Sequence, residues 1–184
     1  TYSQSFSVAG QVTNPRGIAF NADGTKMFVV DKDNSDISEY SLSTAFNVST
    51  ASYSQDFDIS AQETDPVGIA FNADGTKMFI VGQNGSDVNE YTLSTAFDVS
   101  TASFVDAFSI SAQETSPTDI AFSADGTAMF ITGSGGEDVN KYTLSTGFDV
   151  STASYTNSYS VASKDTAPMG IAFNADGTKM FITG

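Results

Sequence analysis

The sequence predicts an all-β fold, a β-propeller built from four-stranded antiparallel blades of about 51 residues. The first observation is a segment, GIAFNADGTKMF or a close variant, that recurs at a constant spacing of 51 residues. Its four copies start at Gly17, Gly68, Asp119 and Gly170. A second segment, LSTAFNVSTAS or a close variant, recurs at the same spacing. No segment shows the apolar periodicity and caps of an α-helix, which excludes most helical repeats.

These repeats define the domain organisation that we expect. Complete repeats cover residues 17–67, 68–118 and 119–169, and a partial repeat covers 170–184. Residues 1–16 correspond to the outer strand and linker of a preceding blade. Three interpretations stay open: the chain is part of a longer one with six to eight blades, its copies assemble as a homo-oligomer into one ring, or a four-bladed ring closes imperfectly.

The first half of a blade is predicted as a tight hairpin. Its first strand is Gly17–Phe20, in which Ile18 and Phe20 alternate with small residues. Residues 21–24, Asn-Ala-Asp-Gly, are typical of a type I turn that ends in a left-handed glycine. The second strand, Thr25–Val30, is apolar on both faces, so we expect it to lie between two neighbouring sheets.

The second half of a blade completes the sheet. A polar loop leads to a third strand over Ile37–Leu42, and a fourth strand covers Tyr53–Ile59 with apolar residues on one face. Residues 2–8 align with this fourth strand, so we expect the chain to open on an outer strand. A polar linker, residues 60–65, then leads to the next first strand.

Composition excludes several function classes. Cysteine and histidine are absent, which excludes thiolate and imidazole metal sites, disulfides, and Ser-His or Cys-His catalysis. The chain has seven basic and 22 acidic residues and thus a net charge of −15, so we expect no nucleic-acid partner. No apolar run reaches the ~20 residues of a membrane helix, so we expect no membrane span. The acidic surface suits a saline medium, and we expect a secreted or surface-exposed protein.

One repeat pattern resembles a known family. The pattern PxGIAFxxDGTKMFVV, followed by SDxxxEYxL, resembles the YVTN-type repeats of the lactonase-like and surface-layer β-propellers. This resemblance covers the whole chain and implies a propeller of six to eight blades. Its members include secreted surface proteins and some enzymes, so the resemblance is specific for fold and not for function.

The linkers and the loops after the second strands share one face of a propeller, and we expect ligands to bind there. Side chains on this face vary between repeats; for example, Arg16, Val67, Thr118 and Met169 occupy one position. The candidate ligand-face residues are Arg16, Asp36, Glu63, Asp65, Asp87, Glu114, Asp138, Lys164 and Asp165. Such a face could recognise a glycan or a protein.

A calcium loop is a weaker interpretation of the first such loop. Asp31, Asp33 and Asp36 alternate with other residues, as the oxygen ligands of a calcium loop do. The glycine and the distal glutamate of that motif do not fit. We therefore expect no cofactor, with calcium as the alternative.

Near-identical blades offer no unique catalytic group, so the sequence favours a binding protein over an enzyme. We expect a non-catalytic extracellular or surface module for binding, adhesion or scaffolding, in which repeated weak contacts add up. Two alternatives stay open. One is a structural component of a fibre, sheath or virion; the other is a lactonase-like enzyme, in which acid–base work would fall to carboxylates, lysine or tyrosine.

Overall fold

A computed structural model of the chain describes residues 4–184 and contains three four-stranded antiparallel sheets and one two-stranded sheet. The first sheet comprises β1 (Pro15–Phe20), β2 (Lys26–Asp31), β3 (Asp36–Leu42) and β4 (Ala51–Asp58). The second comprises β5 (Pro66–Phe71), β6 (Lys77–Gly82), β7 (Asp87–Leu93) and β8 (Ala102–Ser109). The third comprises β9 (Pro117–Phe122), β10 (Ala128–Gly133), β11 (Asp138–Leu144) and β12 (Ala153–Ser160). The last is β13 (Gly170–Phe173) with β14 (Met180–Thr183).

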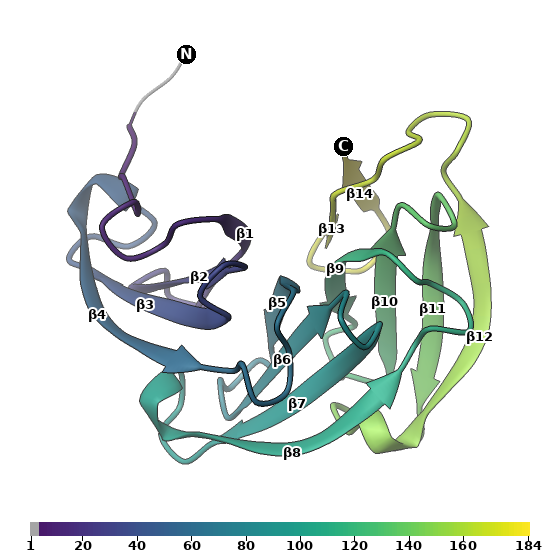
Figure 1. The fold of residues 1–184 in the computed structure, drawn as a ribbon, viewed down its shortest axis with the longest axis horizontal. Coiled ribbons are helices and arrows are strands. Elements are labelled where there is room, and N and C mark those ends of the chain that lie inside the picture. The colour runs from purple at the N-terminus through teal and green to yellow at the C-terminus, as the bar shows by residue number, and fades with distance from the viewer. Residues whose placement is uncertain (1–3) are drawn as a thin grey trace.

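The sheets follow one another along an open arc, with β1, β5, β9 and β13 on the inside and β4, β8 and β12 on the outside (Figure 1). The strands in each sheet are ordered as in the sequence, and neighbouring inner strands pack against each other. This arrangement is that of propeller blades and confirms the predicted fold class.

The predicted strands are confirmed, with boundaries that shift by one or two residues at most ends. The hairpin turn also forms as expected: Gly24 has φ 70° and Asp23 accepts a hydrogen bond from the Thr25 N–H. Of the outer strand predicted over residues 2–8, residues 2 and 3 lie outside the described part. Residues 4–8 form no strand, because the described residues place no third strand of that blade beside them.

Short 3-10 helices, which the sequence did not predict, precede the outer strands. They are η1 (Val48–Thr50), η2 (Val99–Thr101) and η3 (Val150–Thr152). Each begins at an Asn or Asp whose side chain accepts a hydrogen bond from a backbone N–H two residues later. Within residues 4–184, none of the helices has the length and apolar character needed to cross a bilayer.

The hydrophobic core lies between successive sheets. The second strands β2 and β6 are buried on both faces, as predicted; in β6, Met78 and Phe79 are fully buried. Phe79 packs against Phe122 and Phe148 of the following blade, with ring centroids 4.5 and 6.1 Å away. Burial of apolar surface contributes about 25 cal/mol per Å2, so a blade is stabilised chiefly by its neighbour.

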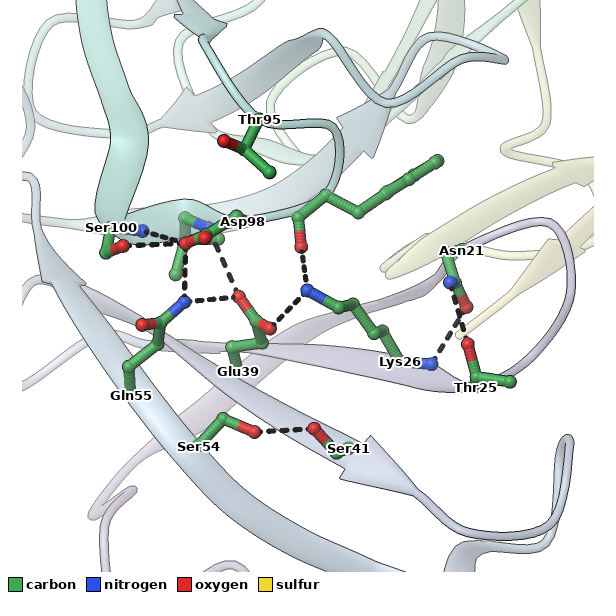
Figure 2. Close-up of polar contacts among 12 residues, drawn as sticks. Asn21, Thr25, Lys26, Glu39, Ser41, Ser54, Gln55, Thr95, Asp98 and Ser100 are labelled. Carbon is green, nitrogen blue, oxygen red and sulfur yellow. Dashed lines mark hydrogen bonds and ion pairs between the residues drawn. The ribbon is translucent and has the colours of Figure 1, made fainter.

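An ion pair between the partly exposed Lys26 and the buried Glu39 reinforces the contact between the first two blades (Figure 2). The Lys26 Nζ donates to Glu39 Oε1 at 2.7 Å and to the Phe97 carbonyl of the next blade at 2.6 Å. Glu39 Oε2 accepts from the Val99 N–H at 3.1 Å and from Gln55 at 2.9 Å. Each charge is therefore compensated by several hydrogen bonds, which a buried ion pair requires.

Three of these four bonds recur between the second and third blades: Lys77 Nζ donates to Glu90 and to the Phe148 carbonyl, and the Val150 N–H donates to Glu90. The third blade lacks the pair, because Ala128 and Lys141 occupy the two positions.

A second buried carboxylate ties the linker before each blade to the loop after its second strand. Glu114 is 1% exposed and accepts from the Ser116 N–H at 2.6 Å and the Gly135 N–H at 3.1 Å. Glu63 is fully buried one repeat earlier and accepts from the Asp65 N–H at 2.6 Å.

The first repeat supplies this carboxylate from the opposite side. Asp31, at the end of β2, accepts from the backbone N–H groups of Thr13 and Asn14 at 2.8 and 3.1 Å. Val12 occupies the linker position that Glu63 holds one repeat later. Glycine, Gly82, occupies the strand-end position of Asp31, and a Cβ there would collide with the Glu63 carboxylate. One carboxylate fits at this junction, from either side.

This exchange predicts strong coupling between Glu63 and Gly82. Glu63→Val leaves buried N–H groups without an acceptor and should lower the free energy of unfolding by roughly 2 kcal/mol. Gly82→Asp should cost at least as much, because two carboxylates then compete for one space. The double variant reproduces the first repeat and should lie within about 1 kcal/mol of wild type in denaturant unfolding. Additive losses in the double variant would contradict the exchange.

Candidate functional site

The candidate site is a cavity of about 240 Å3 on the inner side of the arc. Its lining consists of seven residues that come from just two repeat positions. Residues of the first position stand at or near the start of β1, β5 and β9 and just before β13, and are Arg16, Val67, Thr118 and Met169. Residues of the second position directly follow β2, β6 and β10, and are Lys32, Gln83 and Ser134. Every blade therefore presents a different side chain to one shared cavity.

Positive charge gathers at this cavity, although the chain as a whole is acidic. Two of its seven basic residues, Arg16 and Lys32, line the cavity. Lys32 Nζ lies 2.7 Å from Asp65 Oδ1, and both side chains are about 30% exposed. Arg16 is exposed to solvent. This cavity can therefore attract an anion.

Polar groups from the other blades are fixed by hydrogen bonds to the backbone. Gln83 Nε2 donates to the Pro117 carbonyl at 3.0 Å, and Thr118 Oγ1 donates to the Pro168 carbonyl at 2.8 Å. These bonds orient both side chains and leave their acceptor oxygens for a ligand.

A second hollow, of about 440 Å3, shares Arg16 and Thr118 with the first and continues along the inner strands. Asp119 also lines it, in a position that is glycine in the three other repeats. Asp119 Oδ2 accepts from the Ile171 N–H and Oδ1 from its neighbour Ile120, both at 2.9 Å. Burial raises the pKa of Asp119 to about 6, and these two hydrogen bonds oppose the shift.

The predicted ligand-face residues are placed in three ways. Arg16 lines the cavity and Asp65 pairs with its Lys32. Glu63 and Glu114 point into the blade and hold loops, and Asp165 accepts from the Ala167 N–H at the equivalent place. The remaining candidates, Asp36, Asp87, Asp138 and Lys164, are outside the lining of the cavity.

The acidic loop proposed for calcium is occupied by protein donors. Asp31 accepts from five groups, among them the backbone N–H of Asp33 and the side chain of Asn34. Asp33 in turn accepts from Asn14. In the described part of the chain, no group of three or more acidic residues is arranged to hold a metal ion.

Sequence reasoning missed Lys32, Gln83, Ser134 and Asp119. A comparison of the repeats position by position carries the signal for all four. Lys32, Gln83 and Ser134 are equivalent and all differ, and Asp119 replaces a glycine.

Asp36 lies in a row of like charges that the other blades lack. Asp31 and Asp58 are its cross-strand partners, where the second blade has Gly82 and Ser109 around Asp87. Burial, followed by the charges of Asp31, Asp56 and Asp58, raises the pKa of Asp36 to about 6.

This row predicts that Asp36→Asn stabilises the protein at neutral pH. Because the pKa of Asp36 is raised, the native state binds the Asp36 proton more tightly than the unfolded state does. The free energy of unfolding therefore falls as pH rises from about 4 towards 6 and Asp36 becomes charged. We expect a rise in Tm of about 2–4 °C at pH 7 that disappears near pH 4. Asp87→Asn, without neighbouring aspartates, should gain less. An equal Tm for Asp36→Asn and wild type at pH 7 would refute this explanation.

Comparison with protein-family models and with curated proteins gave no match. Solved structures do match. Two are putative 6-phosphogluconolactonases, from Bacteroides uniformis (TM-score 0.65, 14% identity) and Bacteroides fragilis (TM-score 0.66, 13% identity). Each alignment covers 91% of this chain and 46% or 47% of the other, so the chain spans less than half of their length. The third is the β-propeller domain of Myceliophteria thermophila Cps50 (Swd1), with TM-score 0.60, 11% identity, and coverage of 92% and 50%.

These matches correct the expectation about enzymatic activity and confirm the predicted β-propeller fold class. The sequence led us to expect that the chain is not an enzyme, and the two lactonase structures among its matches overturn that expectation. One propeller scaffold carries different activities, so identities this low establish the fold alone. The chain has a β-propeller fold similar to that of the lactonase structures.

Proposed function

We propose that the protein is a lactonase-like hydrolase and that the cavity around Arg16 and Lys32 binds an anionic sugar lactone. One observation carries this proposal: every residue that lines the cavity comes from two repeat positions, and at both of them no two blades share a residue. A repeated scaffold thus presents a distinct set of side chains at one concave place, which is typical of a ligand site.

The charges of the cavity suit the substrate of the matched lactonases. A phosphorylated sugar lactone carries its charge on the phosphate, and its hydrolysis product also carries a carboxylate. The planar guanidinium of Arg16 matches either anion in a bidentate contact. Because the net charge of −15 repels anions, a local cation is needed to attract such a substrate, and Arg16 supplies it, since Lys32 is paired with Asp65.

The reaction also benefits from this cation. Attack of water on the lactone carbonyl places negative charge on the carbonyl oxygen in the transition state. A fixed cation or hydrogen-bond donor near that oxygen lowers the barrier, because the interaction strengthens as the charge develops. Arg16 is one donor that this cavity offers, and Gln83 Nε2 has a second hydrogen besides the one that it donates to the Pro117 carbonyl.

A lactone panel tests the proposal on the chain itself. We expect hydrolysis of 6-phosphogluconolactone above the spontaneous rate, a lower kcat/KM for gluconolactone, and the lowest for γ-butyrolactone, followed by proton release at constant pH. Arg16→Ala should reduce kcat/KM for the phosphorylated substrate by about 10–100-fold.

Lys164→Ala is the matched control, because it removes the same charge from an exposed residue outside the cavity. It should leave kcat/KM unchanged. Absence of turnover for all three lactones, or equal losses in both variants, would overturn the proposed function.

A further inference from the structure

The strongest feature that the proposed function does not explain is a break in the repeat on an inner strand. Glycine occupies this position in the first, second and last repeats, as Gly17, Gly68 and Gly170, and Asp119 occupies it in the third. Glycine suits the position because the inner strands approach closely: a Cβ on Gly68 would lie 2.9 Å from the Asp119 Cα. An aspartate here is a costly exception to a constant packing rule.

Asp119 is fixed by hydrogen bonds and still lines the second hollow. Its two oxygens accept one backbone N–H each, from Ile120 on its own strand and from Ile171 on β13. A carboxylate oxygen has two lone pairs, so each keeps one that can face the hollow that Asp119 lines. The two bonds therefore fix the carboxylate without exhausting it.

The surroundings leave this carboxylate a stronger base than an ordinary aspartate. Burial raises its pKa to about 6, so at pH 7 it is mostly ionised and still binds a proton readily. Among the described residues that line the same hollow, Arg16 is the other charged side chain. The Asp119 carboxylate on β9 and the Arg16 guanidinium on β1 thus line one hollow from two different blades.

We infer that Asp119 is the general base of the hydrolysis, a catalytic residue that activates the attacking water in the second hollow, which Asp119 and Arg16 line together. This inference rests on the proposed function. In the first step, the Asp119 carboxylate takes a proton from water while the water oxygen forms a bond to the lactone carbonyl carbon, giving a tetrahedral oxyanion.

In the second step the oxyanion collapses. The bond between the carbonyl carbon and the ring oxygen breaks, and the ring oxygen takes the proton from Asp119. One water is consumed, one hydroxy acid is formed, and the carboxylate is regenerated. The reaction needs no oxidant, reductant or other co-reactant.

Two variants at this position test the role without risking the fold. Asp119→Gly restores the residue of the other three repeats, and Asp119→Asn removes the basicity, keeps the side-chain size and retains one of the two acceptor oxygens. Both should lower kcat for 6-phosphogluconolactone by about 10²–10⁴-fold with little change in KM. Asp106→Asn, which removes a carboxylate from the exposed outer strand β8, is the matched control and should retain wild-type kcat.

The pH profile separates a base from a residue that merely pins β13. Wild-type kcat/KM should rise with pH and level off above about 6, and this acidic limb should vanish in both Asp119 variants. Binding of 6-phosphogluconate, measured by calorimetry, should stay within a few-fold of wild type.

The outcomes are distinct. Wild-type turnover with an unchanged rate and acidic limb in the Asp119 variants would overturn the assigned base and leave the lactonase standing. Absence of turnover in the wild-type chain would overturn both.

Discussion

The structure depends on the need of each blade to be covered by the next. The second strand is apolar on both faces, so a blade without the next blade would leave the face that carries Phe79 in water. Stacking buries that face, and the Lys77–Glu90 pair fixes the stacking by reaching the backbone of the following blade. Because this contact repeats, the inner strands are brought side by side, and a shared cavity forms where they begin.

Packing also explains where the sequence is free to vary. Turn glycines, the buried aromatic residues and the junction carboxylate each serve the blade, and they recur or are exchanged for an equivalent, as Asp31 is for Glu63. At the start of the inner strands and just after the second strands, side chains face the cavity and carry no packing duty shared by all blades. Arg16 and Lys32 can therefore differ from their counterparts without loss of the fold.

Most of the fold could be predicted from the sequence, because spacing, strand patterns and the Asp-Gly turn are local or periodic signals. The site was harder. Glu63 and Glu114 are charged and stand in linkers, which suggested a ligand face, yet both are buried and bind backbone N–H groups of their own blade. Asp119 was missed because its importance lies in the glycines that it replaces. Contacts between residues 50 positions apart, such as Thr118 with Pro168, are visible in three dimensions alone.

The blades converge to form one cavity, and we propose that this cavity binds an anion. A crystal structure of the chain with bound 6-phosphogluconate, the ring-opened product, tests this claim most directly. We expect the phosphate or the carboxylate of the product to lie within hydrogen-bond distance of Arg16, in the cavity that Arg16, Lys32 and Thr118 line. A product bound elsewhere, or an empty cavity at saturating product, would contradict it.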